Sequence, residues 1–401
     1  MPRKILASFC TLLVLTACVQ SNSLHAQGIA LTGVGPVNRS MGGAGTAAPL
    51  DAIGALHWNP GSIGALPRNE LAFGMELLSA DVKLSSTVGG VTGTTSSDPG
   101  WVTIPAIGWV HHMEGTPVTV GLGLFGVGGF KNNMPLDPTN PLLSGPPFLG
   151  PAFASSEIMQ IAPTIAYQLS EQISVGFAPT ITTITLNLDP LGPSVITPAP
   201  TPGQGNRMHW GLGFQTGVYY RGDNDIDAGF SFKSPQWVEE LEFFTPGGAV
   251  NFNLDYPMML SLGLAYRGIE NLVIAIDGRY LDYEHTDGFK EFGWRSVFAG
   301  AIGAQYSMTD RLTARLGYNF NQNPIQSSVV ALNLLDPLIQ DQNIAAGASY
   351  RFTNNVDFNL AYVYLLNNSV SGPLPAPFPV GSSATHHLSA HSAVAGISVK
   401  Y

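Results

Sequence analysis

Apolar and polar side chains alternate with a period of two residues along most of the chain after residue 69. Between residues 311 and 320, for example, Leu312, Leu316 and Phe320 fall on one face, while Arg315 and Asn319 fall on the other. This period is typical of β-strands with one apolar and one polar face. The pattern predicts about fourteen strands, near residues 69–88, 101–113, 116–130, 155–169, 172–188, 208–221, 225–244, 248–267, 270–285, 294–308, 311–323, 343–352, 355–368 and 385–401.

The connections between these strands alternate in length. Short polar turns are expected at residues 113–117, 169–172, 221–225, 267–271, 308–311 and 352–355, and long loops rich in Pro, Gly and Ser at 132–154, 190–207, 325–341 and 371–384. This alternation is typical of an outer-membrane barrel whose short turns face the periplasm. A soluble sheet with one face on a core is the alternative, but it gives no reason for the alternation.

The residues before the first strand have a different pattern. They are small and apolar, and a helix-like run at 47–56 is followed by Asn59 and Pro60. Because proline disfavours the helical conformation of the residue before it, the helix should end there. We therefore expect an all-β fold in which residues 27–68 form a small helical hatch, or plug, in the lumen. Residues 69–401 are expected to form a transmembrane antiparallel β-barrel.

The first residues are typical of an export signal. Two basic residues near the start precede an apolar run at residues 5–19, which is too short to span a membrane as a helix. We expect a signal peptide at 1–26. The alternative is a lipoprotein signal at 1–17 with an acylated Cys18. Both cysteines, Cys10 and Cys18, lie in this region, so the mature chain should have neither a disulfide nor a thiolate metal site.

Composition narrows the choice of partners. Charged residues make up 11% of the chain, against about 25% in an average soluble domain. The net charge of −10 argues against nucleic acid as a partner. Beyond residue 19 no apolar run reaches the roughly 18 residues that a membrane helix needs. A chain of this kind would therefore cross a membrane only as a closed barrel, with membrane lipid around it.

Short motifs spread over the mature chain resemble the FadL/TodX family of outer-membrane transporters of hydrophobic compounds. They are Ser40–Gly45, Trp58–Gly61, the stretch 256–267, and Arg315–Phe320 followed by 323–325. Gly61 departs from the alanine that the family usually shows. The resemblance implies a plugged monomeric barrel in the bacterial outer membrane that takes up long-chain fatty acids or other hydrophobic small molecules, without a cofactor. The motifs leave open whether the ligand is a fatty acid or an aromatic hydrocarbon.

The resemblance also implies that outer loops capture the ligand and that a gap beside a kinked third strand releases it laterally. Two loops are unusually apolar and are the candidates for the outer groove, although such patches can also pack loop against loop. The groove candidates are Leu142, Leu143, Phe148, Leu149, Leu334 and Leu335.

The third predicted strand contains five glycines between residues 118 and 130. Glycine weakens a strand and often marks a bulge or a close backbone approach. We expect Gly126, Gly128 and Gly129 to let the strand bend beside Phe125, with the Asn59–Pro60 turn against the bend and the Asn59 amide bonded to the freed backbone groups. The alternative is that small residues make room for the hatch. The hatch glycines singled out by the resemblance are Gly42 and Gly45.

Polar residues on the predicted lumen faces suggest further chemistry. Arg279, Arg315 and Arg351 are candidates for binding a ligand carboxylate, and the alternative is an ion pair with Asp277 or Asp357. The histidines at 111, 112, 386, 387 and 391 suggest a metal, but adjacent strand residues face opposite ways. We expect no metal.

No Gly-x-Ser-x-Gly motif marks a lipase nucleophile. We therefore expect that the protein is not an enzyme. The chain ends in Val399 and Tyr401 on one strand face, which resembles the signal read by the barrel-assembly machinery. A structural or adhesin barrel, or a general porin, remains the alternative function, and an outer-membrane lipase is a weaker one.

Overall fold

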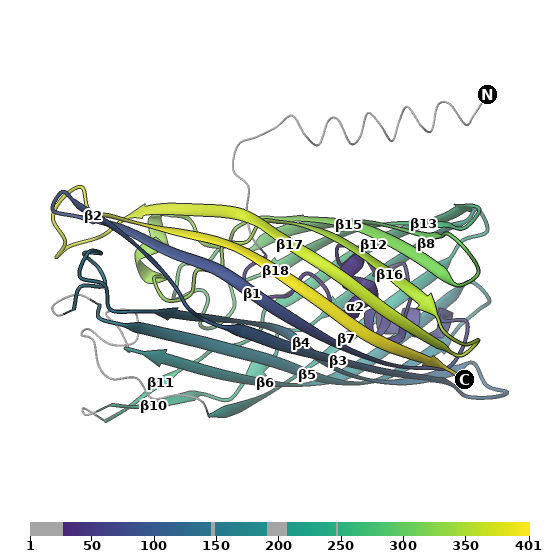
Figure 1. Ribbon diagram of the computed structural model, residues 1–401. Helices are drawn as coiled ribbons and strands as arrows, with labels where there is room; N and C mark the ends of the chain where they lie inside the picture. The colour runs from purple at the N-terminus through teal and green to yellow at the C-terminus, as the bar shows by residue number, and fades with distance from the viewer. Residues whose placement is uncertain (1–26, 146–148, 191–206, 246–247) are drawn as a thin grey trace.

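The strands close into one antiparallel barrel in the computed structural model, which describes residues 27–145, 149–190, 207–245 and 248–401 (Figure 1). The barrel strands are β1 (Glu70–Val88), β3 (Trp101–His112), β4 (Val118–Met134), β5 (Ala152–Gln168), β6 (Ile173–Asp189), β7 (Met208–Arg221), β8 (Ile226–Lys233), β12 (Met258–Ile269), β13 (Leu272–Asp282), β14 (Val297–Ser307), β15 (Leu312–Asn321), β16 (Gln342–Arg351), β17 (Val356–Pro373) and β18 (Ser383–Lys400). Pairing of β1 with β18 closes the ring. The prediction of a barrel of 14 strands is confirmed.

Two predicted strands have the wrong bounds. β8 ends at Lys233 and β12 begins at Met258, whereas the sequence pattern extended both strands toward residue 245. Pro235 and Pro257 stand just beyond these ends, and proline has no N–H for the ladder. The residues between them form β9 (Trp237–Val238), which pairs with β7, and a separate hairpin of β10 (Leu241–Thr245) and β11 (Gly248–Phe252).

The two ends of the barrel differ as the connection lengths predict. Tight turns join the strands at the right-hand end in Figure 1, and long loops gather at the left-hand end. The loop end carries the β10–β11 hairpin, β2 (Val91–Ser96) and the short helix η2 (Ser327–Leu332). No helix in the described part of the chain has the length and apolar character needed to cross a membrane.

Side-chain alternation along the strands is also confirmed. In β15, Leu316 and Phe320 are exposed on the outer surface, and Arg315 and Asn319 are buried on the lumen side. In β17, Leu360 is exposed and Asn359 is buried in the same way. Apolar side chains therefore cover the outside of the barrel, where a bilayer would contact them.

The residues after the predicted signal peptide lie inside the barrel, toward the end with tight turns (Figure 1). They form α2 (Gly35–Ser40), α3 (Ala52–Trp58) and η1 (Pro60–Ala65), and we call residues 27–68 the hatch. α3 begins later than the predicted run at 47–56, because the Asp51 side chain caps it by accepting a hydrogen bond from Gly54 N at 3.0 Å. It ends before Pro60, as the sequence predicts. The predicted signal peptide falls outside the described residues.

Glycines of the barrel wall face the hatch on eleven strands. A Cβ atom at each of these positions would lie against hatch atoms, so only glycine allows the two backbones to approach so closely. We call this set the glycine belt: Gly74, Gly108, Gly121, Gly176, Gly217, Gly229, Gly263, Gly303, Gly317, Gly347 and Gly396. The belt explains why the strands of this barrel are rich in glycine.

Candidate functional site

An apolar cavity of about 70 Å³ lies among the loops at the loop end of the barrel; we call it the outer cavity. Leu149, Leu334 and Leu335, three of the predicted groove residues, line it. The other lining residues are Ile29, Phe130, Leu186, Leu188, Pro190, Phe252, Leu254, Phe289, Phe292, Ala331, Leu332, Asp336 and Leu338. Asp336 is the one charged residue among these described lining residues.

Two predicted groove residues lie elsewhere. Leu142 and Leu143 are fully buried in the apolar core. They line neither the outer cavity nor the second cavity described below. Their loop is folded back on β1, because Asn140 Nδ2 donates a hydrogen bond to Leu84 O at 2.9 Å. They therefore hold the loop against the wall, which is the packing alternative left open by the sequence. Phe148 falls outside the described residues.

A second cavity of about 370 Å³ lies beside β3 and β4; we call it the wall cavity. Its volume is within the range of small-molecule sites. Residues 102–105 of β3, and Gly126 and residues 128–131 of β4, form part of its lining. Ile29, Phe130 and Leu338 line both this cavity and the outer cavity, so the two adjoin.

The wall cavity lies where two barrel strands separate. β3 and β4 pair from His112 opposite Thr119 to Ala106 opposite Phe125, and no further pairs follow in the described residues. Beyond Phe125, β5 is the one described barrel strand that pairs with β4, with a register shift between Gly126 and Gly128. The loop before β3 meets β4 again farther out, where Asp98 N donates to Asn133 O at 2.9 Å. We call the opening between these contacts the window.

The beginning of the hatch covers the freed edge of β4. Ala30 forms a β-bridge with Gly128, and Leu31 N donates to Val127 O at 2.9 Å. Gly129 N donates to Ile29 O at 3.3 Å, and Gly129 has a φ of 143°, which favours glycine. The glycines therefore agree with both interpretations of the sequence. They lie at the bulge of the strand, and their small size also makes room for the hatch. Phe125 is buried just below the window, with its ring edge-on to that of His57 at 5.5 Å.

The predicted place of Asn59 at this bend is wrong. Its Nδ2 donates to Thr46 O at 2.9 Å and to Val218 O of β7 at 3.0 Å. Its Oδ1 accepts from Gly61 N at 3.0 Å and caps η1. These roles hold Asn59 and Pro60 against β6, β7 and β8, so backbone groups of Ile29–Leu31 meet the bend instead.

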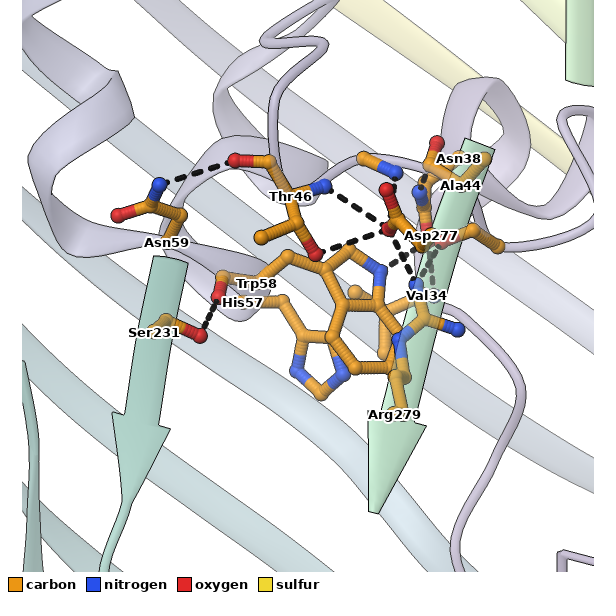
Figure 2. A network of polar contacts seen from close by, with 12 residues as sticks. Val34, Asn38, Ala44, Thr46, His57, Trp58, Asn59, Ser231, Asp277 and Arg279 are labelled. Carbon is orange, nitrogen blue, oxygen red and sulfur yellow. Dashed lines mark hydrogen bonds and ion pairs between the residues drawn. The ribbon is translucent and has the colours of Figure 1, made fainter. Parts of the chain in front are cut away.

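A buried polar network fixes the hatch to β13 (Figure 2). Asp277 Oδ2 accepts hydrogen bonds from Gly45 N at 2.8 Å, Thr46 N at 3.0 Å and Thr46 Oγ1 at 2.9 Å. Arg279 Nη2 donates to the same carboxylate at 2.7 Å and to Gly43 O at 2.6 Å. The guanidinium lies 3.5 Å from the ring centroid of Trp58, and both charged side chains are fully buried. Arg279 therefore forms an ion pair with Asp277, which was the alternative to its binding a ligand carboxylate.

The other predicted arginines lie at the end with tight turns. Arg315 Nε donates to Gln305 Oε1 at 2.6 Å, and Arg351 Nε lies 3.6 Å from Asp357 Oδ1. Both arginines line a polar cavity of about 150 Å³ below the hatch, and neither lines the outer or the wall cavity. No group of three or more His, Cys, Asp or Glu residues is placed to hold a metal in the described ranges.

Two parts of this site were not predicted. Residues 29–31 give no sequence signal, because their contacts with β4 are made by backbone groups. Asp336 had a weak signal, as the one charge in the apolar stretch 329–339. Gly42, in contrast, was predicted as a hatch glycine: its φ is +65°, and a Cβ there would meet the backbone of Tyr318 in β15.

Comparison with known proteins agrees with this architecture. The family model described as outer membrane protein transport protein (OMPP1/FadL/TodX) matches residues 12–239 and 252–398. Outer membrane protein P1 of Haemophilus influenzae is 23% identical over 189 residues, which is 41% of this chain and 40% of that protein. The match thus spans less than half of that relative's length.

Solved structures show the same fold at low sequence identity. The toluene transporter TodX of Pseudomonas putida has a TM-score of 0.71 and 18% identity, covering 92% of this chain and 99% of that chain. A FadL homologue of Pseudomonas aeruginosa has a TM-score of 0.73 and 14% identity, covering 93% and 99%. The toluene transporter TbuX of Ralstonia pickettii has a TM-score of 0.68 and 18% identity, covering 92% and 99%.

Proposed function

This chain belongs to the outer membrane protein transport family (OMPP1/FadL/TodX), and from that premise we propose that it takes up hydrophobic small molecules and releases them sideways into the outer membrane. The family supports transport in the outer membrane. The window supports the lateral route: β4 leaves β3 beyond Phe125, directly beside a cavity of about 370 Å³. That single observation carries the proposal.

The route follows the two adjoining cavities. A hydrophobic molecule leaves water for the apolar loops of the outer cavity, because burial of apolar surface is favourable. It then passes Ile29, Phe130 and Leu338, the residues shared by both cavities, and reaches the wall cavity. From there the window gives access to hydrocarbon, so the molecule need not return to water.

The hatch has two roles in this proposal. Its main part fills the lumen and is anchored to Asp277, which closes the straight path to the periplasm. Its first residues, Ile29–Leu31, satisfy the backbone groups that β4 would otherwise leave unpaired at the window. A backbone partner at this place meets the requirement that no polar group be left free in a bilayer.

We further propose that the protein works as a monomer and that Tyr401 guides its assembly. The C-terminal tyrosine is exposed on the outer surface of the barrel, where Trp109 Nε1 donates to its hydroxyl at 2.7 Å. Its recognition by the barrel-assembly machinery stays a prediction.

A reversible cross-link across the window tests the lateral route. A Cβ at Gly126 would lie 3.7 Å from Cβ of Ile104, which suits a disulfide. In the variant with Ile104→Cys and Gly126→Cys, oxidation should hold β3 and β4 together and block uptake, while binding to the purified protein persists. Reduction should restore uptake.

The matched control is His111→Cys with Val120→Cys, which joins the same two strands where they already pair. Oxidation of this control should leave uptake unchanged. If the oxidised window variant takes up ligand at the wild-type rate, the ligand does not leave through the window, and a path past the hatch becomes the better account.

A further inference from the structure

The outer cavity has an unusual distribution of charge. Its described lining is apolar except for Asp336, which follows η2 in the loop between β15 and β16. The wall cavity, in contrast, has Lys131 and Glu157 in its lining, one charge of each sign.

Two basic residues of the loop that supplies Phe289 and Phe292 to the lining are engaged with other groups. Lys290, on the loop after β13, pairs with Asp287 and lies 3.6 Å from Glu291. Arg295, on the same loop, donates its Nε to Asn323 O at 2.9 Å. The lumen arginines lie lower, in the hatch anchor and the polar cavity. Within the described lining of the outer cavity, a ligand carboxylate would therefore meet the carboxyl group of Asp336 and no cation.

Asp336 itself lies in an apolar environment. Burial raises its pKa to about 8, and its carboxyl group bonds to its own backbone amide. The residue as a whole is half-buried, and it lines the cavity. An apolar ligand in the cavity would complete the enclosure of the carboxyl group.

These facts have an energetic consequence for the ligand. An ionised carboxylate loses its hydration on entering an apolar cavity, and without a cation nothing replaces it. A neighbouring carboxyl group of Asp336 adds repulsion whenever both groups are ionised. An ester, a ketone or an arene has neither cost, because it carries no charge.

We propose that the outer cavity selects uncharged hydrophobic molecules over fatty-acid anions, and that Asp336 is the residue that sets this charge preference. The inference rests on the proposed uptake function and narrows its substrate class. It leaves the path through the wall cavity and the window unchanged.

Equilibrium dialysis with radiolabelled lauric acid and methyl laurate tests the preference. The protein is embedded in lipid nanodiscs at pH 9, above the pKa of about 8 of Asp336, so that both carboxyl groups are ionised. Empty nanodiscs of the same lipid give the background from partition. The wild type should bind the ester at least about tenfold more tightly than the acid, which corresponds to about 1.4 kcal/mol. In Asp336→Asn the acid should gain affinity, and in Asp336→Lys it should bind more tightly than the ester.

Asp223→Asn is the matched control, because Asp223 is an exposed aspartate in the tight turn between β7 and β8 and lines neither cavity. It should keep the wild-type preference. If the wild type binds the acid as tightly as the ester, or if Asp336→Lys leaves the order unchanged, the charge preference is wrong while uptake stands. If neither probe binds above the empty nanodiscs, the proposed function itself fails.

Discussion

The hatch meets the barrel wall in two places that are built differently. At its seat, toward the end with tight turns, the wall glycines lie directly against the hatch. There the buried ion pair Arg39–Glu76 joins the hatch to β1, and the buried pair Asp277–Arg279 of β13 forms hydrogen bonds to the hatch backbone. At the window, the hatch meets β4 through three residues and a few backbone hydrogen bonds, and a cavity of about 370 Å³ remains beside them.

The difference shows which contacts are suited to move. The seat combines buried charges with close backbone packing, so a shift there would expose unpaired groups and overlap atoms. The window is held by hydrogen bonds next to empty space, so a small shift of Ile29–Leu31 costs few contacts. We therefore expect the seat to stay fixed while the window opens.

Removal of the whole hatch is the most severe test of this division. Deleting residues 28–66 should raise ion conductance in a planar bilayer from near the baseline to that of an open pore, because the lumen would lose the segment that fills it. The wild-type protein measured in the same bilayer is the reference. Equal conductance of the two proteins would show that the hatch does not close the lumen.

The buried ion pair gives the next largest effect. Asp277→Asn leaves Arg279 buried without its partner and should lower the free energy of unfolding by roughly 3–5 kcal/mol. Urea unfolding in lipid vesicles measures this change. The double variant Asp277→Asn with Arg279→Met should recover part of the loss, because it also removes the unpaired charge.

An exposed pair serves as the control for that measurement. Asp81 pairs with Lys83 on the surface of β1, with both side chains roughly half exposed. Asp81→Asn should change the free energy of unfolding by less than about 1 kcal/mol. Similar losses for Asp277→Asn and Asp81→Asn would mean that the seat is not fixed by its buried charges.

The glycine belt gives the smallest effect and the sharpest control. In Gly317→Val the side chain would overlap the backbone of Met41 and Gly42, and such overpacking costs about 1–3 kcal/mol. In Gly278→Val, on β13, the added Cβ has no atom within 4 Å, so the free energy of unfolding should change by less than about 0.5 kcal/mol. If both variants are equally stable, the belt is not what seats the hatch.

Much of the fold could be predicted from the sequence because it depends on local periodicity. The alternation around Leu316 and Arg315 indicates which face of the strand contacts lipid and which faces the lumen. The short turns indicate which strands are neighbours in the sheet. The bounds of β8 and β12 were missed because the β10–β11 hairpin between them has the same apolar pattern as a barrel strand.

The site was harder to predict, because it depends on contacts between distant segments. The glycines near Gly128 signalled a bulge, but nothing in the sequence identifies Ile29–Leu31, 97 or more residues away, as the partner of β4. Asn59 resembled a free amide donor, yet it is occupied by Thr46 and Val218. Leu142 and Leu335 look alike in the sequence, but one supports a loop and the other lines a cavity.

The glycine belt also bears on the unfolded chain. Each glycine in a strand has more conformational freedom to lose than alanine would, at a cost of about 0.5–1 kcal/mol. Eleven such positions would together weaken the sheet by roughly 5–10 kcal/mol, a loss that contact with the hatch has to offset. The barrel wall therefore depends on the hatch for part of its stability. Hatch and wall should unfold together in one cooperative transition rather than in two steps.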